Sequence, residues 1–409
     1  MPSELVELKG HIIDSLSLPR VLDAVLAQGG QFEIEEIIVG KTRDDQSCAR
    51  IRIQAATAEK LESILGYIEK EGANRLDHEN ARLEPAPKDG VFPDDFYCTT
   101  NLPTSVRVAG EWLPVEPIEM DCGIVVENGR AQTVPMNRVL RGQMIVVEHE
   151  GVRVEPQQRR ESHGVFEFMI STVSSEKPKA LMVTEVARRI VETKKQGRKV
   201  LLVGGPAIVH AGAGAAVEGM IRDGWIDVIF AGNALALHDI ESALYGTALG
   251  VSLEEGRPAP HGHEHHLRAV NTIRRVGSIA EAVRQGVLKR GIMRECVLAG
   301  VPFVLAGSIR DDGPLPEVIT DVLEAQDAMR RQLPGIGLAL MVATTLHSVA
   351  TGNLLPASVE VVCVDINAAV VTKLADRGTH QAMGVVTDAA LFMRELADEL
   401  KEEKPCPAS

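Results

Sequence analysis

Apolar residues in the first 85 positions change their spacing from segment to segment. A recurrence at every second position predicts a strand with one buried face, and a recurrence three or four positions apart predicts an amphipathic helix. We expect the order strand, helix, strand, strand, helix, strand over residues 4–13, 17–28, 32–39, 49–54, 57–70 and 74–83. This order predicts a ferredoxin-like βαββαβ module over residues 1–90.

A second pattern begins after residues 84–90, which read EPAPKDG and have the composition of a linker. Between residues 91 and 163, short apolar runs such as 105–108, 122–127 and 143–148 are separated by glycine and proline. The runs show no helical spacing. The pattern therefore predicts a small all-β domain over residues 91–163.

Residues 164–409 show a third pattern, in which runs of consecutive apolar residues alternate with amphipathic segments. Strands that are buried on both faces of a parallel sheet carry such uninterrupted runs. We expect strands at residues 199–203, 226–231, 303–306, 336–344 and 360–364, and helices at 178–196, 215–223, 279–285, 318–330 and within 385–400. The region is therefore predicted to be an α/β domain with a doubly wound parallel sheet, which binds its ligand at the carboxyl ends of the strands.

Length, charge and cysteine usage narrow the class of protein. A chain of 409 residues predicts two or three domains, and a formal net charge of −14 disfavours nucleic acid and anionic membranes as partners. The sequence lacks the run of about 18 apolar residues that a transmembrane helix needs and the pattern of a signal peptide. Its six cysteines stand singly, without a CxxC pair. We expect a soluble, reduced, cytoplasmic protein.

The end of the first buried strand is rich in small residues. After residues 199–203 the chain continues with Gly204, Gly205, Pro206 and Ala207, and then with HAGAGAA at 210–216. Small residues at the start of a helix let backbone amides approach a phosphate group. The spacing differs from GxGxxG, so the standard dinucleotide fingerprint is absent. A structural glycine-rich turn explains this stretch equally well.

Three further strand ends carry polar residues, and candidate ligand contacts follow from each. These candidates are Gly232, Asn233, Ala234, His238 and Asp239 after the second strand, Gly307, Ser308, Arg310, Asp311 and Asp312 after the third, and Asp365, Ile366 and Asn367 after the fourth, with Lys373 and Asp376 beyond. Taken singly, these residues are also typical of turns and helix caps. Because four strand ends carry them, we expect one ligand site at the edge of the sheet.

Two other features have a simpler explanation. The segment HGHEHH at residues 261–266 contains metal-binding residue types, but no second cluster lies at a recognisable spacing, so we expect no metal site. Cys296 stands alone, and a lone cysteine is more often a core residue than a reactive thiol.

Several long motifs resemble a known enzyme family. NLPTSVRV (101–108), MDCGIVV (120–126) and residues 166–178 resemble the conserved region of lysine-oxoglutarate reductase/saccharopine dehydrogenase. The C-terminal half is similar to archaeal-type ornithine cyclodeaminases and to the corresponding part of cyanobacterial bifunctional arginine-degrading enzymes; it carries the motifs GPAIVHAGA, AGNALALHDIE, AGSIRDDGPLP, TLHSVATGNLLP and CVDINAAVVTKLADRG. Residues 221–239 are more remotely similar to deoxyhypusine synthase. Ala211 and Ala368 depart from the family pattern, which has threonine and proline there.

The resemblance implies a redox-neutral, NAD-dependent conversion of L-ornithine to L-proline and ammonia by a homo-oligomer. The implied NAD site consists of Gly204, Gly205, Pro206, Ala207, Gly232, Asn233, Ala234, His238, Asp239, Gly307, Ser308, Asp311, Asp312, Asp365, Ile366 and Asn367. Candidates for acid–base work are Asp365, Cys296, Lys373, Asp376 and His238. Candidates for binding the amino-acid substrate are Asn101, Arg107 and Arg310. The chemistry needs such groups because protons must leave and rejoin nitrogen and a carboxylate must be held.

Two alternatives remain open at the level of the sequence. An amino-acid oxidoreductase of the lysine-oxoglutarate reductase/saccharopine dehydrogenase type would consume NAD(P)H. A non-catalytic sensor would bind an amino acid and NAD without turnover. The choice among ornithine, lysine and related substrates also stays open, because these substrates differ by only a methylene or so. The choice between NAD and NADP stays open as well.

Overall fold

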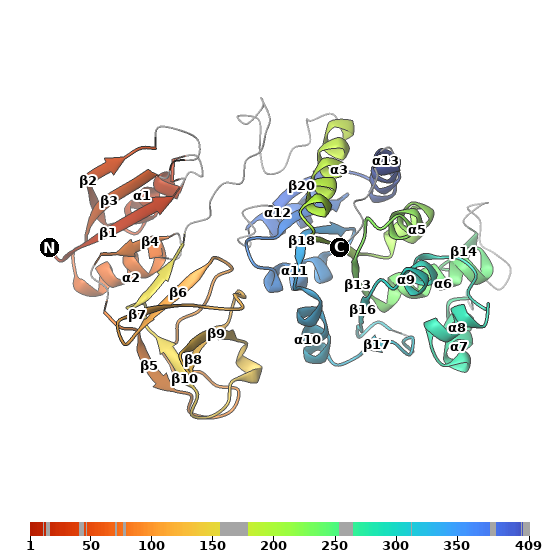
Figure 1. Cartoon of the computed structure of the whole chain (residues 1–409), viewed down its shortest axis with the longest axis horizontal. Coiled ribbons are helices and arrows are strands. Elements are labelled where there is room, and N and C mark those ends of the chain that lie inside the picture. Colours follow the sequence, from red (N-terminus) through yellow and green to blue (C-terminus); the bar gives the residue numbers. More distant parts are fainter. Residues whose placement is uncertain are drawn as a thin grey trace. The chain divides into compact units, whose positions relative to one another are not determined.

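The computed structural model describes residues 1–10, 12–13, 17–40, 45, 47–69, 72–76, 79–155, 179–252, 265–311, 313–376, 382–401 and 403. The chain forms two compact units (Figure 1). The first consists of residues 1–167 with 355–357, and the second of residues 168–354 with 358–409. None of the described helices combines the length and the apolar character that crossing a membrane requires.

The first unit begins with the predicted βαββαβ module. Its elements are β1 (Ser3–Gly10), α1 (Ser17–Ala27), β2 (Gln31–Ile38), β3 (Ser47–Gln54), α2 (Ala58–Glu69) and β4 (Ala73–Arg75). The sheet is antiparallel, in the order β2-β3-β1-β4. Buried residues alternate along β3, and Ile51 and Ile53 pack with Val21 and Ile64 of the two helices. The period-2 and helical spacings therefore identified this module correctly.

The rest of the first unit is the predicted all-β region, and its first strand lies before residue 91. Its strands are β5 (Arg82–Pro85), β6 (Thr104–Val108), β7 (Glu111–Pro114), β8 (Gly123–Glu127), β9 (Arg130–Val134), β10 (Met144–Val147) and β11 (Val152–Val154), with one 3-10 turn at Met136–Arg138. They form the sheets β5-β10-β8-β9 and β11-β6-β7. The single strand predicted over residues 74–83 is wrong, because β4 pairs with β1 whereas β5 pairs with β10. The predicted domain boundaries at residues 90 and 163 stay predictions.

The second unit is the α/β region. Its strands are β12 (Lys199–Gly204), β13 (Val228–Gly232), β14 (Thr247–Ala248), β15 (Val251–Ser252), β16 (Phe303–Ala306), β17 (Val318–Ile319), β18 (Ile336–Val342), β19 (Glu360–Asp365) and β20 (Ala382–Val386). Its helices are α3 (Lys179–Lys195), α4 (Ala207–His210), α5 (Gly214–Arg222), α6 (Asn233–Tyr245), α7 (His265–Val276), α8 (Ile279–Arg284), α9 (Ile292–Ala299), α10 (Val322–Gln332), α11 (Thr345–Leu354), α12 (Ala368–Asp376) and α13 (Ala389–Lys401).

Seven of these strands form one parallel sheet in the order β17-β16-β13-β12-β18-β19-β20. Helices α3, α5 and α13 lie on one side of it, and α10, α11 and α12 lie on the other (Figure 1). The predicted doubly wound parallel sheet is therefore confirmed. Two helix predictions need correction. Residues 318 and 319 pair with β16 as strand β17, and α10 starts only after Asp321, whose side chain accepts hydrogen bonds from Leu323 N and Glu324 N. Residues 385 and 386 belong to β20.

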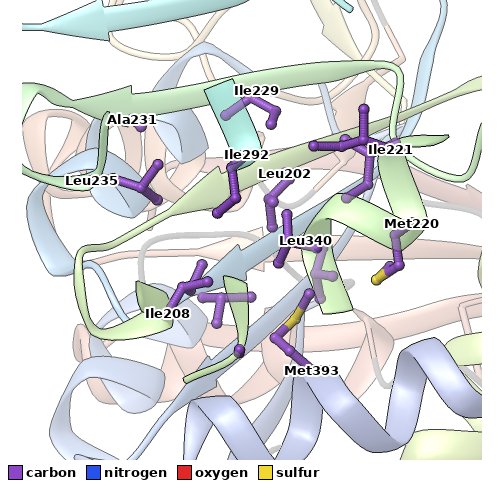
Figure 2. Packing of buried hydrophobic residues seen from close by; sticks show 14 of the residues in the cluster. Leu202, Ile208, Met220, Ile221, Ile229, Ala231, Leu235, Ile292, Leu340 and Met393 are labelled. Carbon is purple, nitrogen blue, oxygen red and sulfur yellow. The ribbon is translucent and has the colours of Figure 1, made fainter. Parts of the chain in front are cut away.

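The main core of the second unit fills the space between the sheet and its first helical layer (Figure 2). Leu202 of β12 and Leu340 of β18 are almost fully buried there and pack with Met220 of α5 and Met393 of α13. Burial of a leucine or methionine side chain contributes about 1.5–3 kcal/mol. This packing holds the central strands in place and so fixes the position of the loops at their carboxyl ends.

Candidate functional site

The order of the strands places a crevice beside β12. From β12 the chain adds β13, β16 and β17 on one side, and then returns to add β18, β19 and β20 on the other. The direction of winding therefore reverses between β12 and β18. In open α/β sheets, ligands bind outside the carboxyl ends of the strands at such a reversal.

The loops after β12 and β18 touch each other through their backbones. Gly205 N donates a hydrogen bond of 2.9 Å to Val342 O. A Cβ atom on Gly205 would lie 1.8 Å from Ala343 O, so a larger residue would force the loops apart. Gly204 is packed similarly, with Leu235 Cδ1 2.7 Å from the position of a Cβ. The glycine pair therefore lets the end of β12 pack directly against the Leu235 side chain and the backbone of the loop after β18.

The end of β13 presents the first turn of a helix to the same edge. Gly232 precedes α6, and no side chain caps the first turn. Asn233 is buried, and its Oδ1 accepts a hydrogen bond of 3.1 Å from Leu315 N in the segment after β16. The amides at the start of a helix carry a partial positive charge and suit an anionic group such as a phosphate.

The ends of β16 and β19 form turns held by their own side chains. Asp311 Oδ2 accepts a hydrogen bond from Ser308 N, and Arg310 beside them is exposed. Asp365 Oδ1 accepts one from Asn367 N, whose own side chain bonds to the Ala369 amide in the first turn of α12. Ile366 is exposed. Asp312 lies outside the described residues.

The predicted gathering of strand ends is confirmed as a matter of geometry. Strands β16, β13, β12, β18 and β19 are consecutive in the sheet and parallel, so their carboxyl ends share one edge. The cofactor contacts of the individual residues there stay predictions.

His347 is a residue of this edge that the sequence interpretation missed. It lies in the first turn of α11, after β18, and its Nδ1 is 3.3 Å from Thr344 Oγ1. Its ring lies against the end of β13, since a Cβ on Gly232 would be 2.9 Å from His347 Cε1. Burial lowers the pKa of His347, and the charge of Asp311 acts in the opposite direction. The signal that could have revealed it is the motif TLHS after a buried apolar run.

His238, which was predicted as an acid–base and cofactor residue, lies in α6, and its ring packs against His210 of α4. Its Nδ1 is 3.3 Å from Glu241 Oε2, and its ring meets that of His210 edge to face at 4.4 Å. Glu241 is fully buried and also accepts hydrogen bonds from Thr247 Oγ1 and from the amides of Leu249 and Gly250. Burial alone would raise the pKa of Glu241, but these hydrogen bonds outweigh it and lower the pKa.

Asp239 and Cys296 lie in the interior. The Asp239 carboxylate accepts hydrogen bonds from Ile292 N at 2.8 Å and Met293 N at 2.9 Å, and so caps α9. Burial raises the pKa of Asp239 to about 7 and that of Cys296 to about 12. The cap and the fully buried thiol give no support to the predicted cofactor and acid–base roles.

The remaining candidates are spread over both units. Lys373 is exposed on α12, and Asp376 forms the end of the same helix. Asn101 and Arg107 belong to the first unit, where Asn101 is buried and Arg107 lies on β6. Their substrate contacts stay predictions. Within the described parts of the chain, no three His, Cys, Asp or Glu side chains are placed to hold a metal ion, and residues 261–264 lie outside those parts.

Comparison with known proteins identifies the family. Residues 184–396 match the family described as arginine dihydrolase ArgZ-like, C-terminal, Rossmann fold; residues 103–183 match its first region, and residues 3–102 match the LOR/SDH bifunctional enzyme conserved region. The ornithine cyclodeaminase of Methanopyrus kandleri is 54% identical over 401 residues, which cover 97% of each chain. The chain belongs to the ornithine cyclodeaminase family. The enzyme of Methanothermobacter thermautotrophicus is also 54% identical, over 98% of each chain.

Solved structures of family members match the fold. The apo structure of ArgZ, a cyanobacterial arginine dihydrolase, matches with a TM-score of 0.85 and 35% identity over 98% of this chain and 58% of ArgZ. A LOR/SDH protein from Methanococcus maripaludis matches with a TM-score of 0.75 and 50% identity over 79% of this chain and 99% of that protein. AgrE in complex with ornithine and NAD⁺ is 40% identical over 98% of this chain and 58% of AgrE, with a TM-score of 0.54.

Proposed function

We propose that this protein converts L-ornithine to L-proline and ammonia in a redox-neutral cycle that uses bound NAD. The observation that carries the proposal is the 54% identity to ornithine cyclodeaminases over nearly the full length of both chains. The relative AgrE, which binds ornithine and NAD⁺ in its crystal structure, supports the choice of substrate and cofactor.

The described residues fit a dinucleotide at the carboxyl edge of the sheet. The strand order β16-β13-β12-β18-β19-β20 is that of the dinucleotide-binding fold, with the crevice between β12 and β18. Gly205 brings the backbones of the loops after β12 and β18 together at this edge, and the first turn of α6 has no side-chain cap. The pyrophosphate would lie against these amides. These backbone features support a dinucleotide but favour neither NAD nor NADP.

The reaction then divides the work between cofactor and protein. NAD, when bound, supplies the capacity to hold the hydride of the substrate Cα and to return it to the same carbon. The protein must remove a proton from nitrogen before oxidation, hold the carboxylate, and protonate the nitrogen that leaves as ammonia. Arg310, which is exposed in the second unit, remains a proposed group for the carboxylate, and Asn101 and Arg107 of the first unit remain separate candidates.

Isotope labelling tests this function directly. The purified protein is denatured to identify its released nucleotide, and the native protein is incubated with L-ornithine labelled with deuterium at Cα. We expect NAD in the supernatant, stoichiometric proline and ammonia, no net absorbance change of reduced nicotinamide, and deuterium retained at Cα of proline. Net accumulation of reduced nicotinamide would instead indicate a dehydrogenase. Ligand binding without turnover would indicate a sensor.

We also propose that the protein works in the cytoplasm as a homo-oligomer. The cysteines of the described chain form no disulfide, which supports a reducing compartment. The exposed Ile34, Ile37 and Ile38 on edge strand β2 support self-association. Light scattering on the native protein tests the second part, and a monomer at micromolar concentration would disprove it.

A further inference from the structure

His347 combines three features that suit it to proton transfer at this edge of the sheet. Its first feature is its position at the carboxyl edge of the sheet. It stands in the first turn of α11 after β18, and its ring packs against Gly232 at the end of β13. Strand β12 lies between these two strands, so the ring reaches across the crevice where the sheet reverses its winding.

A second feature is the way in which the ring is held. Nδ1 is 3.3 Å from Thr344 Oγ1, and a hydrogen bond there fixes the orientation of the imidazole. Nε2 lies over Gly232, 3.4 Å from the position that a Cβ would occupy, and has no hydrogen-bond partner among the residues that the structure describes. One nitrogen is therefore held by Thr344, and the other lies beside Gly232 at the carboxyl edge of the sheet without a partner among the described residues.

The third feature is the electrostatic environment. Burial lowers the pKa of His347, and its place at the positive end of α11 also disfavours an imidazolium. In the described part of the chain, Asp311 after β16 is the one titratable group whose charge acts on the ring, and this charge favours the protonated form. Around neutral pH the imidazole is therefore neutral and able to accept a proton.

We infer that His347 is the acid–base residue of this site, and that its Nε2 takes a proton from the α-ammonium group of the amino-acid substrate and later returns it. Resting on the function proposed above, this inference adds a residue that the strand-end candidates did not include. Thr344 is the positioning residue that orients the ring through Nδ1. Asp311 sets how readily the ring holds the proton.

The proton balance follows the hydride balance. Transfer of the α-ammonium proton to Nε2 leaves a lone pair on nitrogen, which forms the second C–N bond as the hydride leaves Cα. The neutral δ-amine then bonds to Cα, and the π pair of the first C=N bond returns to the α-nitrogen. The new ring nitrogen loses one proton to solvent, and its lone pair forms a C=N bond to Cα as the original C–N bond breaks; the electron pair of that bond goes to the α-nitrogen, and His347 returns the proton there, so that ammonia leaves. The hydride then adds back to Cα and the C=N π pair goes to the ring nitrogen, so the cycle needs no external oxidant or reductant.

The test uses His347→Gln in the full-length protein, with His266→Gln on α7 as the matched control. General acid–base groups contribute roughly 10²–10⁴-fold. We expect kcat/KM for L-ornithine to fall by about that factor in His347→Gln, with the acid limb of its pH profile lost and NAD⁺ binding, measured by calorimetry, kept within about threefold. The control should match the native protein. Added imidazole should restore part of the activity of His347→Ala.

A readout that is independent of turnover separates this inference from the function itself. In protein labelled at histidine Cε1, the NMR resonance that is missing from His347→Gln belongs to His347. We expect it to titrate below the ordinary histidine range and to shift when L-ornithine and NAD⁺ are added. If the native protein makes proline but His347→Gln keeps its rate and pH profile, the inference is overturned and the function stands. If the native protein makes no proline, the proposed function fails. A His347 resonance that is unchanged by L-ornithine then overturns the inference as well, whereas a shifted resonance supports it.

Discussion

Two histidine neighbourhoods within the second unit differ in whether a buried carboxylate ties the histidine into the fold. Around His238, Glu241 is fully buried and binds His238, Thr247 and two backbone amides. Around His347, one ring nitrogen contacts Thr344, and the other has no partner among the described residues. The Glu241 carboxylate of the first neighbourhood joins α6 to the β14–β15 hairpin, although Nε2 of His210, whose ring packs on His238, is buried without a hydrogen-bond partner. The His347 ring lies instead at the carboxyl edge of the sheet.

This difference shows why a histidine motif alone is a weak guide to chemistry. AGNALALHDIE places His238 and Asp239 six and seven residues after Gly232, and TLHS places His347 within one turn of its strand. A ligand at the carboxyl ends of the strands is reached from the loop and from the first helical turn more readily than from the second turn of a buried helix. We therefore expect substitutions around His238 to affect stability most, and those around His347 to affect activity most.

Glu241→Leu is expected to have the largest effect on stability. The substitution leaves Thr247, His238 and the amides of Leu249 and Gly250 without their acceptor. Removing one side of a buried charged network costs about 3–5 kcal/mol. Urea unfolding should show this loss, and hydrogen exchange should accelerate at the Leu249 and Gly250 amides. Exposed Glu399→Leu on α13 is the control, with an expected change below about 0.5 kcal/mol. A loss below about 1 kcal/mol for Glu241→Leu would remove the contrast between the two neighbourhoods.

The pH dependence of this network has a definite sign. The pKa of Glu241 in the folded protein is lowered below its ordinary value. Its contribution to stability is therefore fully present above the unfolded-state pKa, about 4.3, and is lost as the pH falls through the folded-state pKa. The difference in unfolding free energy between native protein and Glu241→Leu should accordingly shrink in acid.

The sequence predicted the scaffold of the site better than its chemistry. Consecutive apolar residues identified β12, β13, β16, β18 and β19, because only strands buried on both faces carry such runs. Because these strands are parallel, the polar residues that follow four of them are expected at one edge of the sheet. Capping roles such as that of Asp239 could not be predicted, because its partners in α9 lie more than fifty residues away.

His347 was missed because one strand was predicted two residues too long. The predicted strand over residues 336–344 includes Ala343 and Thr344, so its end was not counted among the strand ends that carry polar residues. In the structure β18 ends at Val342, and Ala343 has a positive φ of 52° that turns the chain out of the sheet. The turn is held by the contact with Gly205 and by the hydrogen bond from Ala343 N to Val364 O, and both join segments that are distant in sequence.

Gly232→Ala tests the position of the His347 ring with an intermediate effect. Gly232 has φ −93° and ψ 171°, which alanine adopts without strain, so the only conflict is the 2.9 Å approach of a Cβ to His347 Cε1. The ring must shift, and small displacements of a reacting group lower rates about 10-fold or more. We expect kcat/KM to fall about 10-fold while the free energy of unfolding changes by less than about 1 kcal/mol. Gly219→Ala on α5, where a Cβ meets nothing within 4 Å, should keep full activity. An unchanged rate together with an unchanged His347 NMR shift would show that the ring does not face the reaction.

Asp311→Asn should have the smallest effect and tests the electrostatics of the same ring. The Asp311 charge raises the pKa of His347 against the lowering effect of burial, and asparagine keeps an oxygen that can accept the hydrogen bond from Ser308 N. Without the charge, the His347 pKa falls further. The acid limb of kcat/KM and the Cε1 titration should then both move to lower pH, because a smaller fraction of His347 is protonated at each acidic pH. Asp398→Asn, exposed on α13, should leave both curves in place. If the acid limb moves to higher pH, or if the titration moves without the limb, the Asp311 charge does not act on the proton transfer. Burial alone would then account for the environment of His347.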